Sequence, residues 1–342
     1  MSAAAAPTPQ PPVATAPAAG AALPGGLLAA LGLAGGFMGF VAWDQSHWWR
    51  TKEDYAFGWL VPAFVAYIVY DRWHSLTDRV GAAARAGGGP RWARWTWRAA
   101  AGLGLAGGAL LFLLGALYRA GAGPSHPGTL ALTLGMAGLV LALIYFNTPG
   151  GGPAASPATP AGWRALFADP RLRVAALFLF PALVWLISAP IVSVIENQLS
   201  LFLRHKVAVA VMFTFDLLGH PLEQQGNVLV LPDGGTVGVE DACSGIRSLT
   251  ACLFAGSFLG AAFFERLWQK LVLVGAAMAL AFLTNIGRGL FLTAWAYRNG
   301  AEAISGTVHD VAGYAVLGVT CTGLLLLVPL VNLQLEREAP EA

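Results

Sequence analysis

The chain has 342 residues, of which 56% are hydrophobic and 11% are charged. This composition is too apolar for a soluble domain and indicates a protein that crosses a membrane several times. The net charge is only +2, and the sequence has no basic helix with interleaved aromatic residues, so nucleic-acid binding is not expected.

The first 25 residues differ from the rest of the chain. Residues 1–25 are uncharged and rich in Ala and Pro, which predicts a disordered tail. They lack the basic segment that opens a secretory signal, so we expect no cleavage there. An integral membrane domain is expected over residues 26–335, followed by a short cytoplasmic tail at 336–342.

Hydropathy over a window of about 19 residues predicts the membrane segments. Several of them are short or rich in glycine. They predict an all-α membrane protein, a polytopic bundle of about eight transmembrane helices. The segments lie near residues 26–43, 54–70, 99–118, 128–146, 174–195, 245–264, 271–287 and 311–331.

The distribution of basic residues orients this bundle. Twelve of the 20 basic residues fall on one side, which the positive-inside rule assigns to the cytoplasm. Both termini then lie inside, in the plasma (inner) membrane of the cell, and the Arg- and Trp-rich stretch 91–98 acts as an interfacial anchor. The twelve are Arg72, Arg79, Arg85, Arg91, Arg94, Arg98, Arg164, Arg171, Arg173, Arg266, Lys270 and Arg337.

Residues 196–242 form the longest extracytoplasmic loop in this orientation. Apolar side chains at roughly helical spacing over 199–213 predict a helix on the outer membrane surface. Two short strands, 227–231 and 236–240, flank the turn residues Pro-Asp-Gly-Gly and predict a β-hairpin. We expect this small extracytoplasmic hairpin to precede the helix that begins near Cys243.

Cys243 is a candidate nucleophile because of its position. Asp241 can cap the helix that follows, which would place Cys243 in the first turn, where the helix dipole and Arg247 both favour a thiolate. A lone cysteine at the start of a membrane helix is, however, more often structural. Cys252 and Cys321 lie in apolar runs, so the sequence shows no disulfide framework and no metal-binding spacing.

Two more polar residues fall at predicted outer helix ends. Arg288 follows the seventh apolar segment, where a charge is costly unless it is paired, faces a polar cavity or snorkels to the interface. His309 directly precedes the eighth segment. Sidedness alone does not select it, because four other histidines are also assigned outward. These are His47, His126, His205 and His220.

Three motifs follow one another in the chain: Cys243-Ser-Gly245, Asn285-Ile-Gly-Arg288 and His309-Asp-Val-Ala-Gly313. In this order they resemble the signatures of the exosortase/archaeosortase family, membrane-embedded transpeptidases that process C-terminal sorting signals. The whole phrase 239–249 resembles the family's nucleophile motif, and residues 219–232 resemble its approach to the cysteine.

The resemblance extends from about residue 43 to 331. Tyr55-Ala-Phe-Gly-Trp-Leu-Val-Pro62 is also similar to a phrase of the family, although a serine-histidine pair is more usual where Ala56-Phe57 stands.

The resemblance implies a cysteine peptidase or transpeptidase with no cofactor and an active site on the extracytoplasmic face. Cys243 would attack a peptide bond near the C-terminus of a membrane-anchored substrate, Arg288 would stabilise the oxyanion, and His309 would exchange protons. A lipid or glycan acceptor would resolve the thioester, and water would give simple proteolysis.

Three residues are second-rank candidates for this site. Arg247 could tune the thiol or bind an acidic residue of the substrate. Glu240 could orient Arg247 or Arg288, or the acid and arginine could form a structural ion pair. Asn285, from the second motif, is a candidate for substrate binding.

A polytopic transporter or binding protein for an anionic substrate is the alternative from another class. Arg247 and Arg288 would then face a cavity, and two related halves with broken helices would be expected. The sequence shows no convincing internal repeat. A serine nucleophile at Ser244 or Ser248 would need a base that the sequence does not position.

Overall fold

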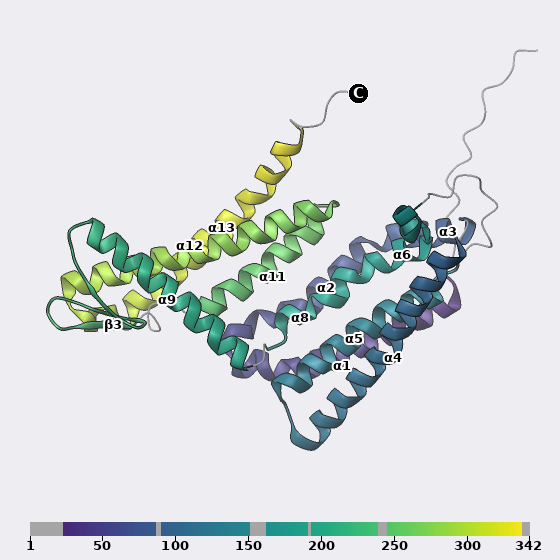
Figure 1. Ribbon diagram of the computed structural model, residues 1–342, viewed down its shortest axis with the longest axis horizontal. Helices are drawn as coiled ribbons and strands as arrows, with labels where there is room; N and C mark the ends of the chain where they lie inside the picture. The colour runs from purple at the N-terminus through teal and green to yellow at the C-terminus, as the bar shows by residue number, and fades with distance from the viewer. Residues whose placement is uncertain (1–22, 87–89, 151–161, 191–192, 239–244, 337–342) are drawn as a thin grey trace, which may run out of the picture.

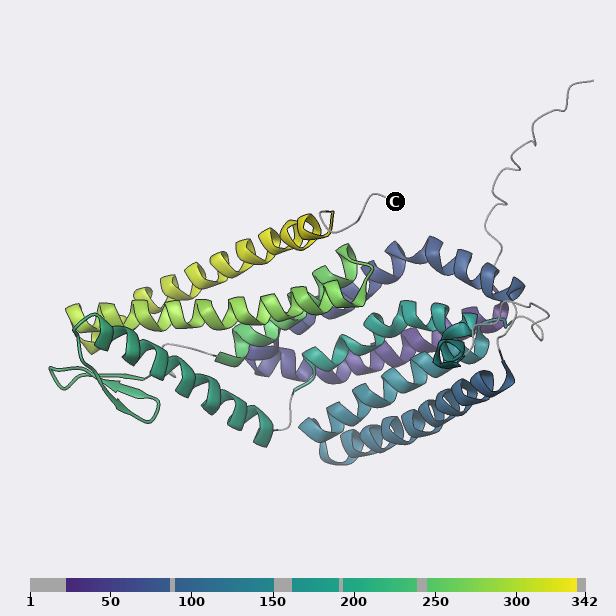
Figure 2. The ribbon, with the colours of Figure 1, turned by 45° about the horizontal axis from the view of Figure 1, so that its top comes forward.

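The computed structural model describes residues 23–86, 90–150, 162–190, 193–238 and 245–336. Helices make up most of this part of the chain, and the long ones other than α9 run roughly along one direction (Figure 1). Helix α9 and a small sheet lie at one end of the molecule, and α3 and α6 lie at the opposite end (Figures 1 and 2).

The N-terminal part packs around α1, α4 and α5. The α4–α5 pair approaches closely because glycines face each other: a Cβ at Gly108 would lie 2.9 Å from the carbonyl oxygen of Gly135. The elements are α1 (Gly25–Thr51), the 3₁₀ helix η1 (Glu53–Leu60), α2 (Val61–Asp71), α3 (Trp73–Arg85), α4 (Arg91–Ala122), α5 (His126–Asn147), the 3₁₀ helix η2 (Gly162–Ala168), α6 (Pro170–Ala175), the 3₁₀ helix η3 (Ala176–Phe178), α7 (Leu179–Leu183) and α8 (Trp185–Ser188).

The C-terminal part is built on α11, α12 and α13, in which α12 packs against both of the others. Helix α9 crosses α12 obliquely in both views (Figures 1 and 2). The elements are α9 (Ser193–Leu217), β1 (Glu223–Gln225), β2 (Val228–Val230), β3 (Thr236–Gly238), α11 (Gly245–Phe263), α12 (Leu267–Asn299), the 3₁₀ helix η4 (Ala301–Ile304) and α13 (Thr307–Glu336).

Six helical stretches in the described ranges are long and apolar enough to cross a membrane. They coincide with six of the eight predicted segments, so the multi-pass membrane architecture is confirmed. The other two segments are shorter: 54–70 divides into η1 and the 11-residue α2, and 245–264 holds the apolar stretch Ser248–Phe263. The count of about eight spans stays a prediction. The six are Gly25–Thr51, Arg91–Ala122, His126–Asn147, Pro170–Ser188, Leu267–Asn299 and Thr307–Val331.

The predicted hairpin is present as the antiparallel pair β2–β3, in which Val228 lies opposite Gly238 and Val230 opposite Thr236. A third strand that the sequence did not reveal, β1, pairs with β2 and gives the order β1-β2-β3. Leu229 and Val237 are buried in a cluster with residues of α9 and α12. The sheet is therefore fixed to the end of these helices, and its place outside the membrane stays a prediction.

The helix predicted over 199–213 is part of the longer α9. Its Val207, Ala208 and Val211 are buried in the cluster that also contains Leu292 of α12. Two aromatic side chains on α9 are exposed instead: Phe202 is 56% exposed and Phe213 is 65% exposed, whereas Phe215 is buried in the same cluster. One apolar face thus packs on the protein and another faces outward.

A buried polar network fixes the C-terminal end of α1. Asp44 is fully buried, pairs with Arg119 of α4 at 2.8 Å, and accepts a hydrogen bond of 2.6 Å from Thr129 Oγ1 of α5. The indole of Trp48 donates to the same threonine at 2.9 Å. Because charges inside a membrane helix are costly unless paired, this network specifies how α1 sits against α4 and α5.

Aromatic contacts and one arginine join the two parts of the chain. Phe64 of α2 stacks on Phe258 of α11 with ring centroids 3.9 Å apart. Arg72, between α2 and α3, donates to the carbonyl oxygen of Ala261 near the end of α11 at 2.7 Å and to that of Leu177 at 3.3 Å. A cation at a helix C-terminus is favourable, so Arg72 holds α11 in place at the end opposite to Cys243.

Candidate active site

Arg288 and His309 meet at the interface of α12 and α13. Arg288 lies beyond the midpoint of α12, and His309 lies in the first turn of α13. Arg288 Nη2 is 3.0 Å from His309 Nε2. Two of the three candidate catalytic residues, 21 positions apart in the chain, are therefore in direct contact.

This contact has a defined direction. A guanidinium has only N–H donors and no acceptor, so Arg288 donates and Nε2 of His309 accepts the hydrogen bond. The charge of Arg288 stays fixed, so the contact places a permanent cation beside the imidazole.

The structure gives a reason for the glycine at the end of the third motif, Gly313. His309 and Gly313 are four residues apart in α13, so both lie on the same face of the helix. A Cβ at Gly313 would lie 3.7 Å from Arg288 Nη2. The guanidinium therefore rests over Gly313 while it contacts His309, and a large side chain at 313 would occupy its place.

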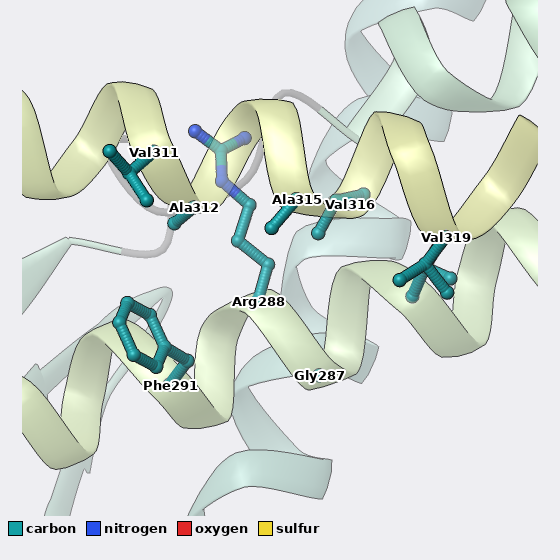
Figure 3. A pocket seen from close by; sticks show the side chains of 9 residues that line it. Gly287, Arg288, Phe291, Val311, Ala312, Ala315, Val316 and Val319 are labelled. Atoms are coloured by element: carbon teal, nitrogen blue, oxygen red, sulfur yellow. The ribbon is translucent and has the colours of Figure 1, made fainter.

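An apolar groove runs along this pair of helices. Its volume is about 390 Å³, and the side chain of Arg288 rises from α12 across it toward α13 (Figure 3). Apart from Arg288 and Thr284, its walls are apolar or glycine. Electrostatic interactions are stronger in such low-dielectric surroundings, so a negative charge that develops beside Arg288 would be strongly stabilised. The other lining residues are Gly287, Phe291, Val311, Ala312, Ala315, Val316 and Val319.

Asn285 links this pair of helices to α11. It is 5% exposed, and its Nδ2 donates to Ser248 Oγ of α11 at 2.7 Å. Asn285 lies three residues before Arg288, so the hydrogen bond fixes the first turns of α11 close to the level of the Arg288–His309 contact. The sequence analysis missed this role of Ser248. A polar residue so early in an apolar helix could have indicated a hydrogen-bond partner on a neighbouring helix.

The remaining candidate residues fall at the junction between β3 and α11. Cys243 and Glu240 lie outside the described residues. Arg247 belongs to the first turn of α11, which begins at Gly245, and its side chain is not part of the described structure. Their roles stay predictions.

The segment 55–62 packs beside the start of α11. Thr250 Oγ1 of α11 donates to the carbonyl oxygen of Asp54 at 3.3 Å, and the rings of Phe57 and Phe254 are 5.3 Å apart. Gly58 is required here, because a Cβ would overlap the indole of Trp49. The N-terminal part thus supports the same helix that Asn285 holds from the other side.

The comparison with protein families identifies the family of this chain. The chain matches the family described as transmembrane exosortase over residues 48–326, a range that includes all three motifs. The chain belongs to this family. No curated protein and no solved structure matches it.

All three motifs thus lie within the part of this exosortase that matches the family. The match supports a membrane protein of the exosortase type and gives no support to the transporter alternative. In the described part of the chain, no three His, Cys, Asp or Glu side chains come together as a metal site would require.

Proposed function

We propose that this exosortase is a cysteine transpeptidase that cleaves a C-terminal sorting signal from exported, membrane-anchored proteins and transfers them to an acceptor. Cys243 is the nucleophile, Arg288 stabilises the oxyanion, and His309 carries the proton. The observation that supports this best is the 3.0 Å contact between Arg288 and His309, residues of two separate motifs.

The nucleophile is linked to α11 by a short piece of chain. Ser244 alone separates Cys243 from Gly245, so the Cα atom of Cys243 cannot be more than about 7 Å from that of Gly245, where α11 begins. Ser248, on the first turns of α11, is hydrogen-bonded to Asn285, one turn from Arg288. Asn285 and Ser248 therefore act as positioning residues in this proposal.

In the first step, the Cys243 thiolate attacks the carbonyl carbon of the scissile peptide bond and a C–S bond forms. The carbonyl oxygen becomes an oxyanion beside the positive charge of the Arg288 guanidinium. The thiol proton goes to His309 Nε2, which gives up its hydrogen bond from Arg288 when it is protonated. The C–N bond then breaks, and the leaving amine takes this proton from Nε2. The product is a thioester on Cys243.

In the second step, a hydroxyl or amine of the acceptor attacks the thioester. His309 accepts the proton of the attacking group, Arg288 again faces the oxyanion, and the thiolate leaves. A lipid or glycan acceptor gives transpeptidation, and water gives hydrolysis. The acceptor class is part of the proposal.

Arg247 and Glu240 complete the proposed site. Arg247, four residues after Cys243 on α11, lowers the thiol pKa or binds an acidic residue of the substrate. Glu240 orients one of the two arginines. We place the site on the extracytoplasmic face of the plasma membrane, as the positive-inside assignment implies.

The test is processing of a co-expressed reporter with a sorting-type C-terminal tail. Wild type is compared with Cys243→Ser, Arg288→Ala and His309→Ala at matched membrane levels. Each variant has a control of the same residue type among the exposed side chains: Cys321→Ser, Arg298→Ala and His74→Ala. Gel mobility reports cleavage, and mass spectrometry of the new C-terminus reports a free acid or an attached acceptor.

We expect all three site variants to lose processing by at least about 100-fold, and the controls to keep it. An attached group at the new C-terminus identifies a transferase, and a free acid identifies a protease. Undiminished processing by Cys243→Ser would remove the nucleophile from the proposal.

A further inference from the structure

A second groove lies at the end of the molecule opposite to the sheet. It has a volume of about 510 Å³ and runs between α4, α5 and the segment from η2 to α7. Phe167 and Leu179 at its rim are 59% and 47% exposed, so the groove is accessible from outside. Its walls are apolar and mostly small, apart from Tyr145. The other lining residues are Trp97, Ala100, Ala101, Gly104, Gly138, Leu141, Ala142, Leu172, Ala175 and Ala176.

The chain around this groove is strongly basic. Segments 71–98 and 162–173 hold nine arginines against three aspartates, and no Lys or Glu. Asp169 is 4% exposed and already accepts hydrogen bonds from Tyr145 Oη at 2.7 Å and from the backbone N–H of Arg171 at 3.0 Å. The acid closest to the groove is thus engaged within the protein, and most of the positive charge is left for another partner.

Arg94 is the arginine best placed for that partner. It lies three residues before Trp97 and seven before Ala101, so all three share one face of α4. Trp97 Nε1 donates to the carbonyl oxygen of Leu166 at 2.7 Å, which fixes the indole at the groove. Arg94 Nε is buried and has no hydrogen-bond partner among the described residues. Arg94 does not itself line the groove, but it lies about one turn from Trp97, which does, and its buried, unused donor favours an acceptor that the protein itself does not supply.

The start of α4 adds to this preference. Arg91, Arg94 and Arg98 fall in its first two turns, the first turn has no acidic residue, and Pro90 provides no side-chain cap. The positive arginine side chains are repelled by the positive end of the helix dipole. An anion bound at this point is therefore stabilised by the arginines and by the dipole.

We propose that this groove binds an anionic phospholipid of the cytoplasmic leaflet, with an acyl chain along the apolar walls and the phosphate at Arg94. The apolar walls and the basic mouth match the two parts of such a lipid, and the basic end is the one that the positive-inside rule assigns to the cytoplasm. A soluble anion would satisfy the arginines and leave the apolar groove empty. The inference is independent of the catalytic assignment.

The test uses the full-length protein in detergent micelles that contain equal amounts of phosphatidylglycerol and phosphatidylcholine with identical acyl chains. Native mass spectrometry measures which lipid stays bound. We expect phosphatidylglycerol to be retained in preference, and Arg94→Gln to weaken its binding about fivefold, the value for one arginine at a membrane surface. Arg85→Gln on α3 removes the same charge from an exposed site outside the groove and should have little effect.

A second variant tests the apolar part of the site. Ala101→Leu fills the groove while leaving every arginine in place, and should also reduce retention of phosphatidylglycerol. Thermal unfolding in lipid-free micelles confirms that each variant is folded. Equal retention of the two lipids, or equal loss in Arg85→Gln and Arg94→Gln, would overturn the proposal, because binding would then reflect diffuse charge or none. Unchanged retention in Ala101→Leu would likewise exclude the groove.

Discussion

Larger side chains at Gly313 should disturb the contact between Arg288 and His309 without changing either residue. A side chain on a helix leans toward the N-terminus of that helix and over the residue four positions earlier. For position 313 that residue is His309. The substituent at 313 is therefore directed at the place where the guanidinium meets the imidazole.

The expected effect depends on size. The methyl group of Gly313→Ala would lie 3.7 Å from Arg288 Nη2, an ordinary van der Waals distance, so activity should stay within about threefold of wild type. Gly313→Leu adds further carbons beyond this point and must displace the guanidinium. A displacement of about 1 Å at a catalytic group can cost about 100-fold, so we expect a loss of that order in Gly313→Leu.

The assay is the initial rate of reporter processing, with membrane level and thermal stability measured for each variant. Alkylation of Cys243 by a membrane-impermeant maleimide, with Cys321 replaced by serine, checks that the thiol is still present and accessible. Equal losses in the alanine and leucine variants would refute the size argument. Full activity in Gly313→Leu would show that the contact between Arg288 and His309 is not needed.

Three other substitutions test contacts around the site. Asn285→Ala and Ser248→Ala should each slow processing, because each removes one partner of the same hydrogen bond. The double variant should be little worse than either single variant, with a coupling free energy of about 1 kcal/mol in a double-mutant cycle. Additive losses would argue against the pair. Gly58→Ala forces a methyl group into a tryptophan ring and should lower stability by about 1–3 kcal/mol in thermal unfolding, whereas Gly36→Ala, which has open space, should not. Arg72→Met removes the donor to two carbonyl oxygens, one near the end of α11, and should cost about 1.5–3 kcal/mol in the same measurement; an unchanged melting temperature would contradict this.

Local patterns in the sequence predict much of the helical framework. Long apolar segments such as 128–146 are found almost where α5 lies, because a membrane helix needs length and hydrophobicity and little else. The hairpin over 227–240 follows from its turn residues, and β2 and β3 lie where it predicts. Strand β1 is missed because Glu223–Gln225 is a short polar stretch without an alternating pattern.

Such local patterns do not predict contacts between segments that are distant in the sequence. The sequence predicts Arg288 and His309 at helix ends; this is wrong for Arg288, because α12 continues to Asn299, where the chain after Arg288 is still apolar. Only the packing of α12 on α13 brings the two residues together. The partnership of Asn285 with Ser248 likewise depends on how α11 rotates against α12. Asp44 could have been noticed as a charge in an apolar helix, but its pairing with Arg119 is set by tertiary structure.

The length of α12 relates the candidate site to the thickness of the membrane. Arg288 follows Leu267, the first residue of this helix, by 21 positions, or about 32 Å along its axis. That distance is close to the hydrocarbon thickness of a typical bilayer, about 30 Å. In the proposed orientation, with Leu267 at the cytoplasmic boundary, a thicker membrane would submerge the guanidinium, and a thinner one would lift it into water or make α12 tilt. Processing should therefore be fastest in lipids of one intermediate chain length, so that the bilayer itself acts as a determinant of activity.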